Sequence, residues 1–374
     1  MQFDKFICLL ATGMACAFSS GAAAMTDAEL AQITEQRLLG DQTKACFAVA
    51  VIDTSVSRVF VCADPRDKNR ISPNSAFEIG SVSKTMLAAL WAEQIEQGKA
   101  SLHDPIAQYL PAGMQVPSFE NQPILLKNLM THTSGLPVVP DFWSALDPSN
   151  PYALIDADSV LATLSQSTLN RAPGSKFEYS NFAMMLATLM LTRQTNTDFE
   201  TLLQTRLLGP LGMASSYVNA RPAGVTAAQG HLPNTQAAPA WTFQTDSAGV
   251  GGVRATLDDM TRFVQAQLGK PPSSMTAALQ LSQQAIKTPA IRTIGMNWMR
   301  SAPFQQTIVS HEGGTGGFSA YVAFNTEASR GVVVLSDTAL TSLSGFTPKQ
   351  PDKTSLKWAT TVPATFIHWL LMHC

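Results

Sequence analysis

The feature of this 374-residue sequence that most constrains its fold is the position of its strand-type segments, which lie near both ends of the chain. Residues 46–53 and 58–64 are apolar, β-branched runs joined by a short turn, which predicts a hairpin. Four further short runs come late in the chain, at 294–299, 306–310, 318–325 and 331–335. The simplest arrangement is an α/β fold of the α+β type, in which one antiparallel sheet is built from both chain ends.

Between these strand runs the pattern is mostly helical. Apolar residues recur at helical spacing after Ser81, which predicts a largely buried helix to about residue 97. Helices are also expected at 26–39, at 257–268 with a capping box of Thr256 and Asp259, and at 355–372 with a kink at Pro363. We therefore expect helices to flank the sheet and a mostly helical lobe to be inserted into it.

These patterns predict one catalytic domain over residues 25–374. The sheet lobe would comprise about 25–80 and 290–374, and the helical lobe about 81–289. A chain of this length can bury a sizeable core. A ligand is expected in the cleft between the two lobes.

The N-terminus has the pattern of a secretory signal. Lys5 precedes an apolar stretch at 6–18, and small residues at 22–24 offer a cleavage site. Residues 1–24 are thus predicted to be a signal peptide, with cleavage near Ala24 and a periplasmic or secreted mature protein. A buried N-terminal helix is the alternative. No later run reaches about 18 unbroken apolar residues, so no stable membrane span is expected.

The composition excludes several classes of function. The formal net charge is −2 and the basic residues are not clustered, so nucleic acid is not an expected partner. With six histidines and neither a CxxC nor an HExxH motif, no metal site or cofactor is expected. We expect a monomer. Cys46 and Cys62 lie on the two hairpin strands and could form a disulfide or remain separate thiols, while Cys374 is left over.

Ser81 and Lys84 are the first candidate site residues. Three residues apart at a helix start, they share one face, and unpaired N–H groups there favour a developing oxyanion. Since a Ser-x-x-Lys spacing also arises by chance as a polar helix start, this pair needs partners.

Two further motifs supply candidate partners. Tyr179 and Asn181 precede a helical run at 182–191, in a position typical of a loop that delivers side chains to a surface. The alternative is structural, with Asn181 capping the helix and Tyr179 half buried. Residues 311–317 hold four glycines between two strand runs, which indicates a close backbone approach or a plain hairpin loop.

Together the motifs resemble those of serine β-lactamases and penicillin-binding proteins, and most closely the class C β-lactamases and related DD-peptidases and esterases. The resemblance rests on FEIGSVSK, LMTHTSGLP, Tyr-x-Asn and GGFSAYVAF, which stand at 77–84, 129–137, 179–181 and 316–324. It implies a β-lactamase/transpeptidase-like fold. It also implies a small-molecule substrate, either a β-lactam or a peptidoglycan-type acyl-D-Ala-D-Ala compound.

The resemblance implies catalytic roles for three residues. Ser81 would be the nucleophile, with Lys84 beside it, and Tyr179 would act as general base with Lys84 or share a proton relay with it. Free lysine and tyrosine titrate near pH 10, so one of them must be shifted by about three units to accept a proton at pH 7. Proximity of a cation to a phenolate and partial burial could supply that shift.

It also implies a substrate-binding set. Asn181 would orient the substrate amide, and the N–H groups of Ser81 and Gly314 would form an oxyanion hole. His311 and Gly313 would bind substrate from the same strand as Gly314.

The sequence departs from class C enzymes at the third motif. These have lysine where this chain has His311, and a hydroxyl residue in place of Glu312. With an unperturbed pKa near 6.5, His311 would carry about a quarter of a charge at pH 7, so an anionic substrate should bind better as the pH falls from 8 towards 6. Segments 250–253 and 135–141 also lack the tyrosine and the glutamine of class C enzymes.

Three functions are compatible with these residues. The first is an exported β-lactamase acting through a Ser81 acyl-enzyme. The second is a DD-carboxypeptidase or endopeptidase of peptidoglycan, or an esterase of the same fold. The third is an idle penicillin-binding protein, which the intact set of Ser81, Lys84, Tyr179 and Asn181 disfavours.

Overall fold

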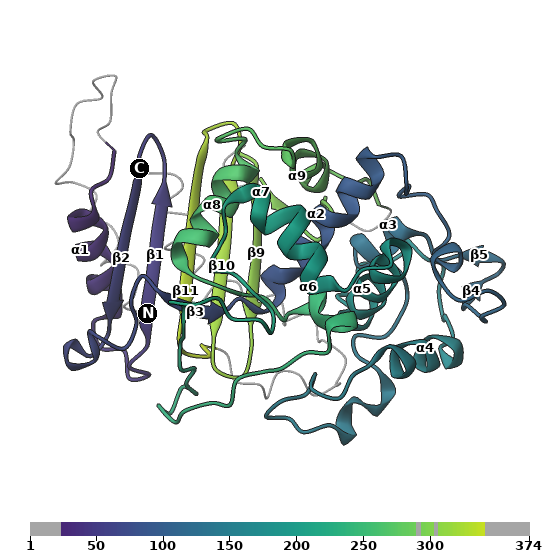
Figure 1. The fold of residues 1–374 in the computed structure, drawn as a ribbon, viewed down its shortest axis with the longest axis horizontal. Helices are drawn as coiled ribbons and strands as arrows, with labels where there is room; N and C mark the ends of the chain where they lie inside the picture. Colours follow the sequence, from purple (N-terminus) through teal and green to yellow (C-terminus); the bar gives the residue numbers. More distant parts are fainter. Residues whose placement is uncertain (1–23, 289–292, 303–305, 341–374) are drawn as a thin grey trace, which may run out of the picture.

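A six-stranded antiparallel sheet in the order β2-β1-β11-β10-β9-β8 is the central element of the computed structural model, which describes residues 24–288, 293–302 and 306–340 (Figure 1). Its strands are β1 (Cys46–Ile52), β2 (Val56–Cys62), β8 (Met299–Ser301), β9 (Ile308–Gly314), β10 (Ser319–Asn325) and β11 (Arg330–Ser336). Because β1 pairs antiparallel with β11, the two ends of the chain meet in one sheet. The predicted fold class is confirmed.

The remaining described elements surround this sheet or lie beside it. Short strands are β3 (Ser75–Glu78), β4 (Ser118–Phe119), β5 (Gln122–Pro123), β6 (Thr226–Ala227) and β7 (Arg254–Ala255). The helices are α1 (Asp27–Leu38), α2 (Ser83–Glu96), α3 (Leu126–Met130), α4 (Ala157–Gln166), α5 (Asn181–Thr195), α6 (Phe199–Leu202), α7 (Gly209–Leu211), α8 (Leu257–Gln267) and α9 (Thr276–Gln283). In Figure 1 the sheet stands at one side and α3, α4 and α5 at the other.

The sheet is covered on both faces because its strands are apolar on both faces. On β1, Ala48 and Ala50 point into the main core, while Val49 and Val51 point the other way and pack with Leu30 of α1. Helix α8 packs against β11, β1 and β10 on the main-core face. Such two-sided burial explains why these strands are continuous apolar runs.

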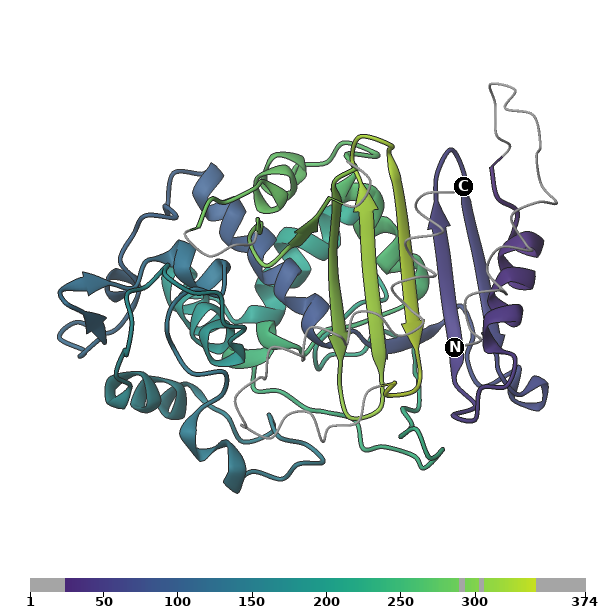
Figure 2. The ribbon, with the colours of Figure 1, turned by 180° about the vertical axis from the view of Figure 1, so that it is seen from behind.

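Helix α2 is the central helix of the molecule and lies between the sheet and the helical part (Figure 2). A short 3-10 helix, Gly80–Val82, leads into it, and α2 is buried from Ser83 to Ala92 and again at Gln94. A helix that is apolar around its whole circumference is expected to be enclosed. The Trp91 indole N–H donates to the Ala187 carbonyl oxygen of α5 at 3.0 Å, which fixes the two helices against each other.

Some local predictions were wrong. Segment 294–299 forms a turn closed by a bridge between Ile294 and Met299, whereas the predicted strand at 306–310 continues to Gly314. The capping box at α8 is only half formed. Thr256 accepts a hydrogen bond from the Asp259 N–H, but the Asp259 carboxylate accepts from Ser215 and Ser216 instead.

Cys46 and Cys62 are joined by a disulfide, which resolves the alternative that the sequence left open. They stand directly opposite each other in the β1–β2 register, with Cα atoms 3.9 Å apart. Residues 1–23 of the signal peptide predicted at 1–24, the predicted helix at 355–372 and Cys374 lie outside the described residues.

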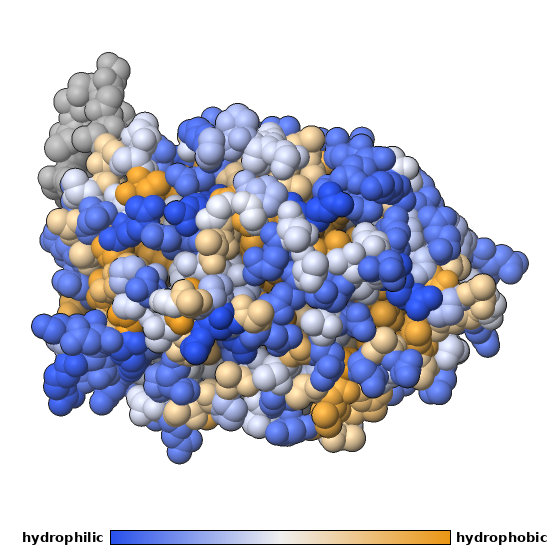
Figure 3. All heavy atoms as spheres, in the orientation of Figure 1, coloured by the Kyte–Doolittle hydropathy of each residue, from blue (hydrophilic) through white to orange (hydrophobic). Residues whose placement is uncertain are grey.

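Within the described residues, no helix combines the length and apolarity needed to cross a bilayer. On the face drawn in Figure 3, apolar residues are scattered among hydrophilic ones and form no continuous band. Leu39 and Leu154 are each about four-fifths exposed, at 80% and 79%.

Candidate active site

The Ser81 hydroxyl and the Lys84 amine lie in direct contact at the start of α2. Lys84 Nζ is 2.8 Å from Ser81 Oγ and 2.6 Å from the carbonyl oxygen of Val250. The Lys84 side chain is fully buried, and burial lowers its pKa well below the usual value. An amine in this environment favours the uncharged form, which has two N–H donors and one lone pair.

Tyr179 lies over this pair from the loop before α5. Lys84 Nζ is 5.1 Å from the centre of its ring. Burial raises the pKa of the Tyr179 phenol, a hydrogen bond with Ser81 opposes the rise, and the charge of Glu312 adds to it. Tyr179 therefore remains a protonated phenol in the unliganded site.

Asn181 is the first residue of α5 rather than its cap. Ser180 is the N-cap, since its hydroxyl accepts from the Ala183 N–H, so the predicted capping role of Asn181 was wrong. Serine and asparagine cap equally well, and the sequence could not choose between neighbours. The Asn181 side chain is 5% exposed, and its Oδ1 has no hydrogen-bond partner in the described part of the chain. This acceptor is free to bind an N–H group.

His132 is a site residue that the sequence reasoning missed. Its ring centroid is 4.3 Å from that of Tyr179, and its Nδ1 accepts a hydrogen bond from the Ser180 N–H at 3.2 Å. The His132 ring therefore packs against the Tyr179 ring and helps to fix its position. Its backbone has a φ of 53°, a left-handed conformation that the sequence pattern does not signal. Only its place in the stretch at 129–137 could have drawn attention to it.

Two glycines allow strand β9 to approach the nucleophile. A Cβ atom at Gly313 would lie 2.0 Å from the Ile79 carbonyl oxygen, and one at Gly80 would lie 2.6 Å from the Gly314 nitrogen. Gly80 also has a φ of 49°, which favours glycine. The first half of the glycine-rich motif is thus a strand pressed against residues 79–81, and its second half, with Gly316 and Gly317, lies in the hairpin turn between β9 and β10.

His311 lies on this strand and is 3% exposed. Its Nδ1 lies 2.6 Å from the Glu312 carbonyl oxygen, and because a carbonyl only accepts, Nδ1 carries the proton. Burial is the main cause that lowers the pKa of His311 to about 3. The expected quarter charge at pH 7 was therefore wrong, since the sequence could not show that the ring is enclosed.

Glu312 points to the other face of the sheet, opposite Tyr321 of β10, and is exposed. Burial is the main cause of the raised pKa of both Tyr179 and Tyr321, and the charge of Glu312 adds to it. The site therefore has an uncharged imidazole and a nearby carboxylate where a lysine and a hydroxyl residue were the expected pattern.

The two other divergent segments also contact motif residues. The Val250 carbonyl oxygen accepts from Lys84, and the Val138 carbonyl oxygen accepts from the N–H groups of Asn181 and Phe182 at 2.8 and 3.1 Å. Segments 250–253 and 135–141 thus border the site through their backbones.

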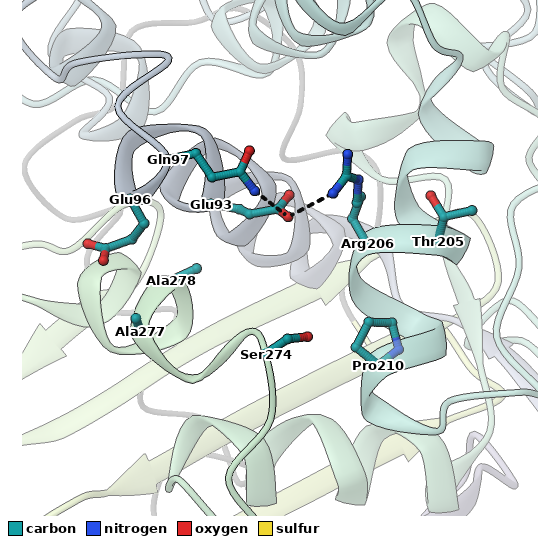
Figure 4. A pocket seen from close by; sticks show the side chains of 9 residues that line it. All are labelled: Glu93, Glu96, Gln97, Thr205, Arg206, Pro210, Ser274, Ala277 and Ala278. Carbon is teal, nitrogen blue, oxygen red and sulfur yellow. Dashed lines mark hydrogen bonds and ion pairs between the residues drawn. The ribbon is translucent and has the colours of Figure 1, made fainter.

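No group of three or more metal-binding side chains occurs among the described residues. A polar hollow of about 360 Å³ lies at the other end of α2, where Glu93 pairs with Arg206 at 3.5 Å (Figure 4). It is lined by no residue of the three motifs.

The arrangement can support acyl transfer. A serine hydroxyl contacts a buried amine, a phenol ring lies near that amine, and the backbone of Gly313 and Gly314 closely approaches residues 79–81. All seven predicted site residues come from these segments, namely Ser81, Lys84, Tyr179, Asn181, His311, Gly313 and Gly314.

Comparison with known proteins gives a consistent result. A family model described as "Beta-lactamase" matches residues 31–345. The D-alanyl-D-alanine-carboxypeptidase/endopeptidase AmpH of Escherichia coli is 30% identical over 77% of this chain and 78% of its own length. A beta-lactamase of Pseudomonas fluorescens is 27% identical over 81% and 91%.

Solved structures share the fold. A beta-lactamase/D-alanine carboxypeptidase of Yersinia pestis, complexed with citrate, superposes with a TM-score of 0.68 at 25% identity, over 84% of this chain and 94% of that one. Its counterpart from Pseudomonas syringae gives a TM-score of 0.67 at 21% identity, over 83% and 94%.

Proposed function

The chain belongs to the serine beta-lactamase and penicillin-binding protein superfamily, a family of serine hydrolases, and on this premise we propose that it hydrolyses an acyl compound through an acyl-enzyme on Ser81. The observation that carries the proposal is the 2.8 Å contact between Ser81 Oγ and the fully buried Lys84 Nζ. A serine hydroxyl becomes nucleophilic when such a base takes its proton.

In the acylation step, uncharged Lys84 accepts the Ser81 proton as Oγ attacks the substrate carbonyl carbon. Its lowered pKa supports this role, and the raised pKa of Tyr179 supports a phenol that relays a proton to the leaving group. The sequence offered Tyr179 as general base with Lys84 or as part of a relay. We now propose the relay, with Lys84 as the group that accepts the serine proton.

The oxyanion that forms is stabilised by the N–H groups of Ser81 and Gly314. Support comes from the tight approach between Gly80 and Gly314, which leaves no room for a side chain at either Gly80 or Gly313. The unpartnered Oδ1 of Asn181 accepts the N–H of the substrate amide.

For the substrate, we propose a β-lactam as in class C enzymes, with release of the acyl group by water. A specific observation supports a second candidate, cleavage of acyl-D-Ala-D-Ala peptides or esters. The uncharged His311 at the position of the usual lysine favours an ester without a carboxylate, and a carboxypeptidase/endopeptidase among the relatives supports the peptide.

One experiment distinguishes these candidates and tests the premise. The purified protein is incubated with a fluorescent penicillin and, separately, with nitrocefin. Rapid nitrocefin turnover supports the β-lactamase, whereas a stable fluorescent label with slow turnover supports the peptidase. An acyl adduct that persists in Ser81→Ala, or that maps to Ser83 by mass spectrometry, contradicts the proposed nucleophile.

We further propose that the protein is exported to the periplasm or secreted. The signal pattern at 1–24 and the disulfide between Cys46 and Cys62 support this, because disulfides persist in oxidising compartments. N-terminal sequencing of the protein from its native host should find a mature chain that begins near Met25.

A further inference from the structure

A buried polar cluster beside the site includes side chains to which the motifs assign no role. Glu78 of β3, three residues before Ser81, is 5% exposed. It stands directly opposite Arg254 of β7, whose Nη2 lies 3.2 Å from Glu78 Oε1. The backbone N–H of Trp241 donates a hydrogen bond to the same oxygen at 2.9 Å. Removing a carboxylate from water is costly, so a strand pair that needed only packing would be more stable with apolar residues.

The second oxygen of this carboxylate lies near Thr315, the residue that follows β9. Burial raises the pKa of Glu78, and the Thr315 hydroxyl is among the groups that oppose the rise. In the unliganded structure neither Glu78 Oε2 nor Thr315 Oγ1 makes a hydrogen bond of standard geometry with any described residue. Thr315 is itself 4% exposed, so solvent does not satisfy its hydroxyl. Each group is therefore the other's available partner.

The location of this pair links it to the reaction. Thr315 directly follows Gly314, and Glu78 directly precedes the segment that Gly313 and Gly314 press against. Glu78 and Thr315 thus flank the junction where the end of β9 approaches residues 79–81. A change in the Glu78–Thr315 contact would alter the separation of the Ser81 and Gly314 N–H groups.

We propose that Glu78 and Thr315 are positioning residues, which hold the Gly314 N–H beside the Ser81 N–H so that both bind the developing oxyanion. This inference rests on the proposed function. Donors of an oxyanion hole act through their fixed position, and a small displacement of one removes much of its effect on the rate.

The primary test is Thr315→Val, which keeps the β-branched shape and removes the hydroxyl, with Thr315→Ser as the rescue. For p-nitrophenyl butyrate we expect kcat to fall about tenfold or more in Thr315→Val with KM within twofold, and Thr315→Ser to stay within about threefold of wild type. Glu78→Gln, which keeps the shape and removes the charge, should lower kcat in the same direction.

A spectroscopic measurement separates positioning from a loss of stability. Hydrogen bonds from the oxyanion hole lower the carbonyl stretching frequency of an acyl-enzyme, so the infrared band of a penicilloyl-Ser81 ester should move to higher frequency in Thr315→Val. The matched control is Ser216→Ala, which breaks another buried hydroxyl–carboxylate pair, Ser216 with Asp259 at 2.8 Å. It should lower the melting temperature without changing kcat or the band.

Two results overturn the inference. One is an unchanged kcat and carbonyl band in Thr315→Val, and the other is an equal change in Ser216→Ala. In both cases Ser81 would still acylate in the wild type, so the proposed function would stand. Absence of any acyl adduct in the wild type would instead contradict the proposed function.

Discussion

The Nδ1 atom of His311 lies 2.6 Å from the carbonyl oxygen of Glu312, and this contact determines which imidazole nitrogen carries the proton. The Nε2 atom has no hydrogen-bond partner among the described residues. His311 thus offers an uncharged acceptor at the position where a lysine would offer a cation. A substrate carboxylate gains no charge-assisted contact from such a ring.

The first prediction concerns pH. The sequence alone suggests that KM for an anionic β-lactam falls as the pH drops from 8 to 6, because His311 would become protonated. With a pKa of about 3, His311 stays uncharged over this range, so we expect KM for nitrocefin to change less than twofold between pH 8 and 6. Steady-state kinetics at constant ionic strength measure this. A steady fall in KM towards pH 6, absent for p-nitrophenyl butyrate, would show that His311 does gain a proton.

The second prediction concerns the missing cation. In the double variant His311→Lys, Glu312→Thr, a cation faces the site and the nearby carboxylate is removed. We expect the ratio of kcat/KM for nitrocefin to that for p-nitrophenyl butyrate to rise about tenfold, equivalent to about 1.4 kcal/mol. Glu312→Thr alone is the control. If the ratio stays within twofold of wild type, residue 311 does not select substrates by charge.

A structural feature of this protein can be predicted from the sequence when it depends on residues that are close together in the chain. The short apolar run of β1 and the helical spacing in α2 are local patterns, and both elements were predicted. Strand β9 was predicted to end at Ser310, because glycines have low strand propensity, yet it continues to Gly314 where those glycines allow contact with residues 79–81.

The same limit applies to the site. The spacing of Ser81 and Lys84 predicts their contact, since both lie on one helix turn. The lowered pKa of His311 and the contact of His132 with Tyr179 depend on what packs around each ring. Such enclosure arises from segments far apart in the chain, so single-sequence patterns do not reveal it.

The third prediction tests the proton relay. In the proposed mechanism Lys84 accepts the serine proton and Tyr179 passes a proton onward, so each depends on the other. Tyr179→Phe and Lys84→Ala should each lower the acylation rate about 10²-fold or more, and the double variant should lose much less than the product of the two. Stopped-flow acylation with a chromogenic β-lactam measures all four rates. Fully multiplicative losses would mean that the two residues act independently.

The fourth prediction concerns the stability cost of the buried amine. Burial lowers the pKa of Lys84, so below the ordinary lysine value the folded chain binds fewer protons at this residue than the unfolded chain. The contribution of Lys84 to the free energy of unfolding therefore becomes less favourable as the pH falls. In urea unfolding, the stability of Lys84→Met relative to wild type should increase from pH 9.5 to pH 6. A difference that is independent of pH would show that the amine has an ordinary pKa.

The last prediction compares two adjacent glycines that differ in the space around them. A Cβ atom at Gly313 would lie 2.0 Å from the Ile79 carbonyl oxygen. At Gly314 the atom nearest to a Cβ would be the Phe318 carbonyl oxygen at 3.8 Å, which is a normal van der Waals distance. Neither has a left-handed φ, so the comparison isolates the contact. Gly313→Ala must push β9 away from Ser81 and should lower kcat/KM about 10²-fold or more, because the Gly314 N–H moves with the strand.

Gly314→Ala keeps the backbone N–H and meets no clash, so it should retain activity within about fivefold. Both variants are compared by kcat/KM for nitrocefin and by thermal unfolding, which verifies that Gly313→Ala still folds. An equal loss of kcat/KM in the two variants would contradict this account. It would mean that the close backbone contact between β9 and residues 79–81 does not set the position of the oxyanion donors. A larger loss in Gly314→Ala would assign the requirement for glycine to substrate access at position 314 instead.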